Sequence, residues 1–182
     1  MKLKLDLHTH CHEATGMRPL SLDIVDRIVE QIKTRGLDGI AITEHWDKNY
    51  GFQVKELVEQ HFNNEVLIIP GQEVDIGSRQ EIVLYLPNHS IFRFLAHPGV
   101  PRSYYDPAAF PDPQSVSNVR GIEVENGMNN WWMNKDLARQ VAAEHDLLML
   151  MNSDAHYLDR IGEFYNELEL EELYARSAPD GW

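Results

Sequence analysis

Two pairs of metal-ligand side chains lie near the two ends of the chain, and each pair follows an apolar run. His8 and His10 are two residues apart, and so are Asp154 and His156. In a β-strand this spacing points both side chains to the same face, so each segment offers two ligands to one site. The two pairs therefore favour a fold in which strand ends from distant parts of the chain converge.

Three more residues of the same chemical kind come directly after short hydrophobic stretches: His45, Glu73 and His97. Imidazole and carboxylate ligands without a thiolate partner suit Zn²⁺, Mn²⁺ or Fe rather than a structural zinc site. Core packing is a poor alternative explanation, because a buried His, Asp or Glu without a partner is costly. The pattern predicts a hydrolase that holds several metal ions.

Length and charge set limits on this interpretation. The 182 residues suit a single domain, which we expect to span residues 1–182. The net charge of −13 repels a phosphate backbone, so no nucleic-acid partner is expected. There is no apolar signal-peptide region and no membrane-length apolar stretch, so we expect a cytoplasmic location without membrane contact. The sequence does not predict the oligomeric state.

Hydrophobic runs alternate with helical patterns along the chain. Strands are expected at residues 3–7, 39–42, 66–69, 82–86, 92–96, 121–125 and 147–151. Helices are expected from Ser21, a favourable N-cap, to Gly36, and also at residues 53–62 and 134–145. Residues 98–118 are rich in Pro, Asp and Ser and predict a long loop, whereas residues 167–174 predict a closing strand or helix.

This alternation indicates an α/β fold with a parallel sheet and helices outside it. The candidate ligands follow several different strands, and (β/α) barrels gather their active-site groups at the carboxyl ends of their strands. An open doubly wound sheet focuses a ligand at one crevice and would collect fewer strand ends. Because the chain is short for eight repeats, we expect a distorted (β/α)7 barrel of the TIM-like kind.

Several motifs, in this order, resemble the PHP (polymerase and histidinol phosphatase) family. The resemblance covers almost the whole chain. It implies a PHP-type, distorted seven-stranded (β/α) barrel, two or three divalent metal ions, and phosphoester hydrolysis as the usual activity. The motifs lie at residues 6–10 (DLHTH), 36–45 (GLDGIAITEH), 69–73 (IPGQE), 96–98 (AHP), 121–127 (GIEVENG), 153–156 (SDAH) and 161–162 (IG).

Carried over residue by residue, the resemblance implies a division of the ligands among the ions. One ion would take four ligands: His8, His10, Glu73 and Asp154. Glu73 would bridge to a neighbouring ion, His45 and His156 would hold the second ion, and His97 would help to hold a third. We accordingly expect Glu73, His97 and Asp154 to be the catalytic residues of a metal-dependent phosphoesterase with a small phosphorylated substrate.

The chain departs from the family pattern in three places. An aspartate ligand of the second ion is often found where this chain has Thr15. His12 or Glu13 could replace it, and we favour Glu13 because a carboxylate can bridge ions and neutralise charge. The strand after the glutamate motif lacks the usual histidine, which weakens the third site unless His89 contributes. The helical insertion before residue 96 is almost absent, so the family's substrates do not transfer to this chain.

Other polar residues have supporting roles in this interpretation. Asp6 and Glu44 are expected to hydrogen-bond near the ligands rather than to bind metal. Three arginines on loops after ligand-bearing strands could bind substrate phosphate or form surface salt bridges: Arg18, Arg102 and Arg160. The loop at residues 98–118 is expected to cover an otherwise open site. Two alternatives remain, an amidohydrolase-like metal hydrolase and a PHP module that binds metal with little or no activity.

Overall fold

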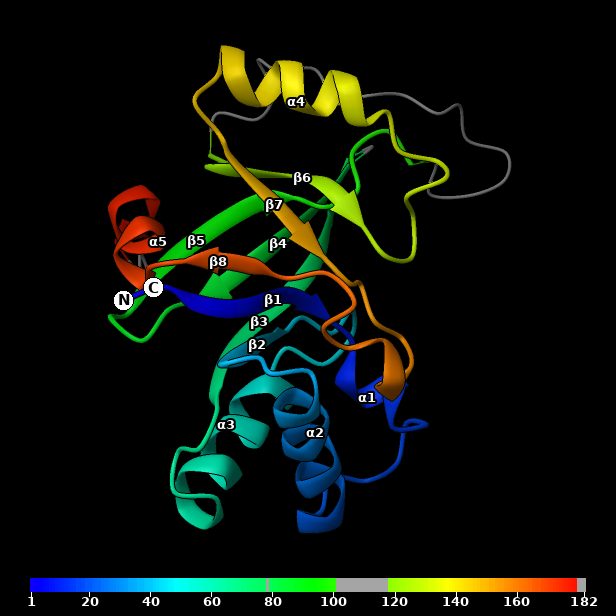
Figure 1. Ribbon diagram of the computed structural model, residues 1–182, viewed down its shortest axis with the longest axis vertical. Helices are drawn as coiled ribbons and strands as arrows, with labels where there is room; N and C mark the ends of the chain where they lie inside the picture. The colour runs from blue at the N-terminus through cyan, green and yellow to red at the C-terminus, as the bar shows by residue number, and fades with distance from the viewer. Residues whose placement is uncertain (78, 101–117, 180–182) are drawn as a thin grey trace.

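The computed structural model describes residues 1–77, 79–100 and 118–179, and its main feature is a sheet curled into a nearly closed barrel (Figure 1). Its strands are β1 (Leu3–Thr9), β2 (Gly39–Ile42), β3 (Leu67–Ile76), β4 (Arg79–Tyr85), β5 (Ser90–Leu95), β6 (Gly121–Asn126), β7 (Leu148–Asn152) and β8 (Asn166–Leu168). Around the barrel they follow the order β7-β6-β5-β4-β3-β2-β1-β8, and the short β9 (Ala178–Pro179) pairs with β5. The expected α/β, barrel-like fold class is confirmed.

The sheet is mixed, whereas the sequence predicted a parallel one. β1, β2 and β3 are parallel neighbours, and so are β5, β6 and β7, but β4 is antiparallel to both β3 and β5. Only residues 77–78 separate β3 from β4, and residues 86–89 separate β4 from β5. A crossover helix does not fit in such short connections, so the chain must reverse direction. In the described part of the chain β8 adds an eighth strand, antiparallel to β1.

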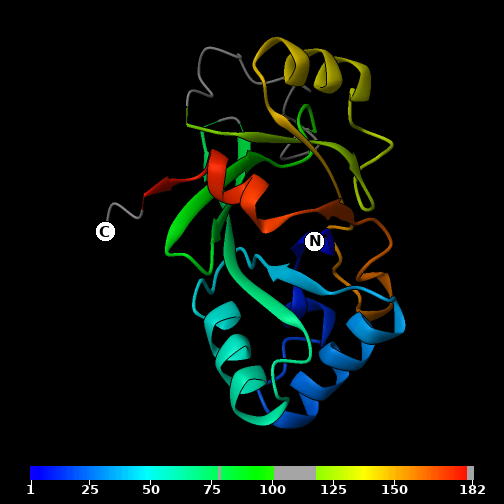
Figure 2. The same cartoon turned by 60° about the vertical axis from the view of Figure 1, so that its left-hand side comes forward.

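Helices cover two parts of the outer surface of the barrel. The neighbouring α2 (Leu22–Thr34) and α3 (Tyr50–His61) lie outside β1–β3, and α4 (Lys135–Glu144) lies against β6 at the opposite end (Figures 1 and 2). The shorter α1 (Cys11–Ala14) and α5 (Leu170–Arg176) follow β1 and β8. The expected N-cap of α2 is confirmed, because Ser21 Oγ accepts a hydrogen bond from Ile24 N at 3.4 Å.

Among the described residues, we find no helix that combines the length and the hydropathy of a membrane span.

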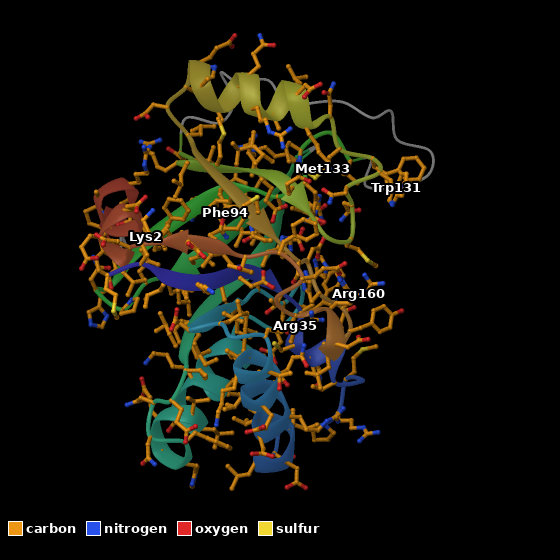
Figure 3. All side chains as sticks on the ribbon, in the orientation of Figure 1. Lys2, Arg35, Phe94, Trp131, Met133 and Arg160 are labelled. Carbon is orange, nitrogen blue, oxygen red and sulfur yellow. The ribbon has the colours of Figure 1, made fainter. Side chains whose placement is uncertain are left out.

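The inside of the barrel is apolar at one end and polar at the other. Phe92 and Phe94 of β5 are fully buried in the apolar end, where they pack with Leu7 of β1. Figure 3 labels Phe94 at this position. A register shift between Asp6 and Thr9 marks a bulge in β1. Leu7 and His8 therefore both face inward although they are successive residues, which a regular strand does not allow. The polar end of the barrel interior therefore starts at this bulge.

A second bulge lies in β6, on the other side of the barrel. Glu123 pairs with Leu150 of β7, but Glu125 pairs with the very next residue, Met151. The extra residue lets Glu123 and Asn126 both turn inward, where Asn126 Nδ2 donates to Glu123 Oε2 at 2.9 Å. Both bulges therefore add polar side chains to the same end of the barrel.

Side-chain amides close the barrel between β7 and β8, its two edge strands. Asn166 of β8 accepts from Met151 N (2.8 Å) and donates to Met151 O (2.9 Å). It also donates to Asn152 Oδ1 at 2.9 Å, and Asn152 in turn accepts from Leu7 N at 3.0 Å. One buried side chain therefore replaces the ladder of backbone hydrogen bonds that a fully closed barrel would have here.

We predict that Asn166→Ala lowers the free energy of unfolding by about 3 kcal/mol, because it removes the hydrogen bonds of a buried side chain to Met151 N, Met151 O and Asn152 Oδ1. Chemical denaturation followed by circular dichroism measures the change. Asn49→Ala is the matched control, because Asn49 is exposed and caps α3 without a side-chain hydrogen bond, and it should change stability by less than about 0.5 kcal/mol. Equal effects of the two substitutions would contradict the closing role of Asn166.

Candidate metal centre

All eight predicted metal ligands lie at the polar end of the barrel, at or just after the carboxyl ends of its strands. β1 and the segment after it, which includes α1, supply three of them, and β2, β3, β5 and β7 or the residues that follow them supply the rest. Each has a ligand atom within 4 Å of that of another member. They are His8, His10, Glu13, His45, Glu73, His97, Asp154 and His156.

Four of these residues form a compact set that we call the buried group: His8, His10, Glu73 and Asp154. The Nε2 atoms of His8 and His10 lie 3.1 Å apart, and each is 3.2 Å from Glu73 Oε2. Asp154 Oδ1 is 3.3 Å from His8 Nε2 and 3.2 Å from His10 Nε2. Ligands about 2.0–2.1 Å from a tetrahedral ion are roughly 3.3 Å from one another, so these spacings fit a metal site.

Two polar atoms of the buried group support the same interpretation. His10 Nδ1 and Asp154 Oδ1 are buried and have no hydrogen-bond partner among the described residues. Three imidazole nitrogens lie 3.2 to 3.6 Å from Asp154 Oδ1, yet none is aligned to donate a hydrogen bond to it. A buried carboxylate oxygen without a donor is costly. A divalent cation among these ligands would satisfy it, so the residues fit a metal ion.

A second, partly exposed set, the outer group, consists of His10, Glu13, His45 and His156. His10 is common to both groups, which the sequence did not indicate. Glu13 Oε2 lies 3.8 Å from His156 Nε2. Thr15, at the position of the family's aspartate, instead donates its hydroxyl to Cys11 O at 2.8 Å. The geometry thus places Glu13, the favoured replacement, with the outer group.

The carboxylate of Glu73 lies between these ligands and His97. Its Oε2 atom is 3.4 Å from His45 Nδ1, and its Oε1 atom is 3.0 Å from His97 Nε2. This is a suitable position for the bridging role that the resemblance implies. His97 and Asp154 have φ angles of 26° and 53°. Such strained backbone persists only where its surroundings hold it and is frequent at functional sites.

Glu123 is the main site residue that the sequence analysis missed. It is fully buried, and its Oε1 atom accepts from His8 Nδ1 at 2.9 Å while its Oε2 atom accepts from His97 N at 2.6 Å. Because a carboxylate accepts hydrogen bonds, His8 Nδ1 carries the proton and Nε2 is available to a metal. Two signals were available: Glu123 lies inside the motif at residues 121–127, and it stands between the apolar Ile122 and Val124.

Asp6 and Glu44 are both buried, with different partners. Asp6 accepts from Ser153 N (3.1 Å) and Gly162 N (2.9 Å), so it ties β1 to the segment that carries Asp154, as its expected supporting role requires. Glu44 accepts from the backbone N of His12 at 2.8 Å rather than from an imidazole. Burial raises the pKa of Glu44 to about 7. It also raises the pKa of Asp6 to about 6, although the hydrogen bonds that Asp6 accepts act to lower it.

The imidazoles and carboxylates of the buried group shift one another's pKa values. Burial alone would lower the pKa of His10, but its contacts with Asp154 and Glu73 raise it to about 9. Burial likewise opposes the rise at His8, whose pKa lies well above its usual value because Asp154, Glu123 and Glu73 surround it. Burial would raise the pKa of Glu73, yet the neighbouring imidazoles hold it well below its usual value.

The remaining candidates are three arginines and His89. Arg18 is exposed, and Arg160 is exposed and ion-paired with Glu163 at 2.8 Å (Figure 3). Arg102 and most of the loop at residues 98–118 lie outside the described residues. His89 precedes β5 whereas His97 follows it, so His89 is at the wrong end of that strand to join the third site.

Comparisons with known proteins bear on this site. Residues 132–175 match the family model described as PHP-associated. A structure from Bifidobacterium adolescentis, of a protein proposed to be a metal-dependent phosphoesterase, aligns with a TM-score of 0.70 and 15% identity over 96% of both chains. PsfC from Pseudomonas syringae aligns with a TM-score of 0.64 and 17% identity, over 88% of this chain and 79% of PsfC. Curated proteins give no significant match.

The fold and the site define an α/β barrel with candidate metal-binding groups at the carboxyl ends of its strands. At such low identities the structural similarity establishes the fold alone. The family match covers residues 132–175, and it agrees with the resemblance of the sequence motifs to the PHP family.

We predict that the metal-free protein loses thermal stability as the pH rises from 6.5 to about 9. The pKa values of His8, His10 and His97 are raised in the folded state. These three histidines stabilise the folded state fully below their unfolded pKa of 6.5. This stabilisation is lost as the pH rises through their pKa values in the folded state, which is about 9 for His10. The lowered pKa of Glu73 affects stability at acidic pH instead. The stabilisation that Glu73 provides is lost as the pH falls below 4.5.

Thermal unfolding in excess chelator measures this dependence. His10→Gln should flatten the slope above pH 6.5, whereas His145→Gln should not, because His145 is exposed at the end of α4 and belongs to neither group. A melting temperature that rises with pH over this range would refute the electrostatic account.

Proposed function

We propose that this chain is a metal-dependent phosphoesterase that hydrolyses a small phosphate ester at the polar end of the barrel. The observation that carries the proposal is the pair of four-residue ligand groups that share His10 and meet at the Glu73 carboxylate. Adjacent divalent ions supply hydroxide near neutral pH and stabilise charge on phosphoryl oxygens. The structural relative proposed to be a metal-dependent phosphoesterase supports the same reaction class.

In this proposal the chain forms one domain that holds two or three divalent ions, with Zn²⁺, Mn²⁺ and Fe as candidates. The buried group would hold the first ion and the outer group the second, while Glu73 and His97 would hold a third. Imidazole and carboxylate ligands suit all three metals. The substrate would be small and phosphorylated, the location cytoplasmic, and nucleic acid is disfavoured by the net charge of −13.

Several residues of the chain would orient the ligands without binding metal. Glu123 holds the ring of His8, and Asn129 donates to Asp154 Oδ2 at 2.8 Å, which leaves Asp154 Oδ1 directed at the buried group. Arg18 and Arg102 remain candidates for binding the phosphate. The pairing of Arg160 with Glu163 favours a surface salt bridge in its case.

We predict at least two divalent ions per chain, because seven ligands in two groups exceed what one ion can use. Elemental analysis of protein reloaded with Zn²⁺, Mn²⁺ or Fe²⁺ and then desalted measures the stoichiometry. His10→Gln should reduce the occupancy of both groups, and His145→Gln should leave it unchanged. Less than one equivalent after reloading with every metal would exclude a multinuclear centre.

We also predict metal-dependent hydrolysis of p-nitrophenyl phosphate or bis-p-nitrophenyl phosphate. Glu73→Gln should lower kcat by more than about 100-fold, because even residues that only orient metal ligands typically contribute 10- to 100-fold. His97→Ala should lower kcat about tenfold, since His97 belongs to neither four-residue group and lies closest to a single oxygen of Glu73. Glu59→Gln, on the exposed face of α3, is the control.

Two results would replace this proposal with one of its alternatives. Full metal occupancy without turnover on either substrate would favour a PHP module that only binds metal. Turnover on lactones or amides but not on phosphoesters would favour an amidohydrolase-like enzyme.

A further inference from the structure

A buried side chain, that of Glu44, joins two of the segments that supply the outer group. His10 and Glu13 come from the segment after β1, which includes α1, whereas His45 follows β2. Glu44 is the residue directly before His45. Its Oε1 atom accepts a hydrogen bond at 2.8 Å from the backbone N of His12, the residue directly before Glu13. The hydrogen bond therefore connects the immediate neighbours of two outer-group residues.

The backbone pairing of β1 with β2 ends before these two residues. Thr9 pairs with Ile42, and Thr43 N donates to Thr9 O at 2.9 Å. The next amide of the β1 segment, that of His10, donates instead to Ala155 O at 2.9 Å. Beyond the paired part of the two strands, the Glu44 side chain therefore holds the start of α1 beside the end of β2.

The start of α1 needs a partner from outside the helix. α1 has four residues, and its N-cap residue His10 makes no side-chain capping hydrogen bond. The first N–H groups of a helix have no acceptor within the helix, so the amide of His12 depends on the Glu44 carboxylate. The ring of His12 also stacks on Tyr50 of α3 with centroids 4.8 Å apart, but this contact does not involve the end of β2.

The outer group depends on such a link more than the buried group does. The His8 side chain is fully buried, whereas the side chains of Glu13 and His45 are 31% and 27% exposed. Partly exposed side chains keep more conformational freedom, which they must lose when they bind an ion. Because Glu44 is buried, water does not readily replace its hydrogen bond once it is lost.

We propose that Glu44 is a positioning residue for the ion of the outer group, because it sets the distance between Glu13 and His45. Without its hydrogen bond, α1 can move away from the end of β2, and the two ligands separate. The buried group keeps its geometry, since Glu73 lies in β3 and Asp154 follows β7. The inference rests on the proposed function, because it concerns an ion that the proposed metal centre would hold.

Two substitutions separate the reach of the Glu44 side chain from its charge. Glu44→Gln keeps an oxygen at the same distance from the backbone, so it can still accept from His12 N. Glu44→Asp keeps the charge, but it is one methylene group shorter and loses the hydrogen bond. Because the glutamine variant also preserves the size of the side chain, it tests the inference even if the shorter side chain destabilises the fold.

The measurement is a titration of the metal-free protein with Zn²⁺ in competition with a chromophoric chelator, which gives the affinity of each bound equivalent. Glu44→Asp should weaken one equivalent by about 10- to 100-fold, the range typical of residues that orient metal ligands. The other equivalents should not change. Glu44→Gln should retain most of the affinity that Glu44→Asp loses.

Glu13→Gln identifies the equivalent that belongs to the outer group, because Glu13 is a member of that group only. This substitution should weaken the same equivalent as Glu44→Asp. In the double variant the loss of affinity should be smaller than the product of the two separate losses, since both substitutions act through the same ligand.

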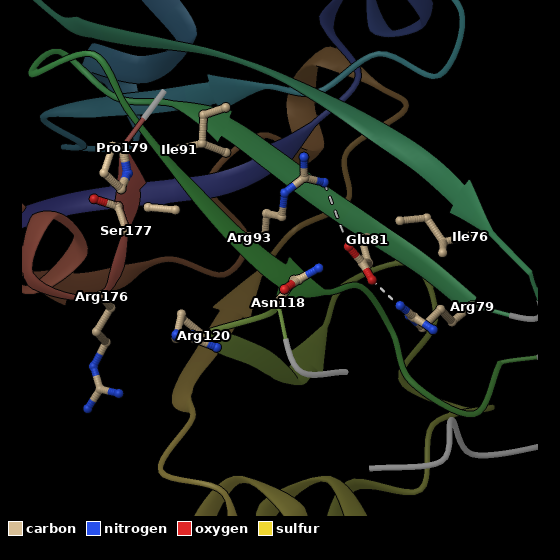
Figure 4. Close-up of a pocket in the computed structure, with 11 residues that line it drawn as sticks. Ile76, Arg79, Glu81, Ile91, Arg93, Asn118, Arg120, Arg176, Ser177 and Pro179 are labelled. Carbon is tan, nitrogen blue, oxygen red and sulfur yellow. Dashed lines mark hydrogen bonds and ion pairs between the residues drawn. The ribbon is translucent and has the colours of Figure 1, made fainter. Parts of the chain in front are cut away.

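Glu81→Asp is the matched control. The side chain of Glu81 is only 2% exposed and accepts from Arg79 Nε at 2.7 Å (Figure 4). It points to the outer face of β4, because the next residue, Ile82, packs in the core. Shortening this similarly buried carboxylate should leave the affinity of every equivalent unchanged. Thermal unfolding in excess chelator checks that each variant is folded.

The outcomes distinguish this inference from the proposed function. A wild-type protein that binds fewer than two ions would overturn the proposed metal centre and the inference with it. A wild-type protein that binds two ions and hydrolyses phosphoesters, but whose affinities do not change in Glu44→Asp, would overturn the inference alone. The same conclusion would follow if Glu44→Gln weakened the outer equivalent and Glu44→Asp did not, because charge rather than reach would then decide.

Discussion

The burial of several carboxylates at one end of the barrel is the constraint on which the rest of the structure depends. Glu73, Glu123 and Asp154 are almost completely removed from water, which is costly for any carboxylate without compensating partners. Imidazoles from the ends of four strands surround Glu73 and Asp154, and the amides of Asn126 and Asn152 donate to Glu123. The polar end of the barrel can form only when all these segments are in place.

This compensation requires a backbone that departs from regular strands. The bulge in β1 turns His8 toward Glu73, and the bulge in β6 turns Asn126 toward Glu123. Asn152 accepts from Leu7 N and donates to Glu123, so it joins the amide network that closes the barrel to the network that orients His8. Stability and the arrangement of the ligands therefore depend on the same hydrogen bonds.

The wall of the barrel gives its two faces opposite chemistry. Its inner face gathers acids and imidazoles that fit cations, whereas on its outer face Arg79 of β4 and Arg93 of β5 flank the buried carboxylate of Glu81. Adjacent residues of one strand, Glu81 and Ile82, belong to the two faces. β4 contributes to both the apolar core and the charged outer surface because successive side chains of a strand alternate between faces.

The sequence by itself determined the element types and the chemical nature of the site. Apolar runs, the N-cap Ser21 and the spacing of His8 from His10 are local signals, so the strands, helices and candidate ligands could be predicted from them. The tertiary structure alone decided the antiparallel β4, the sharing of His10 and the role of Glu123. Bulges, strand register and a partner such as Glu123, 115 residues from His8, have no local periodicity, because they arise from contacts between segments far apart in the chain.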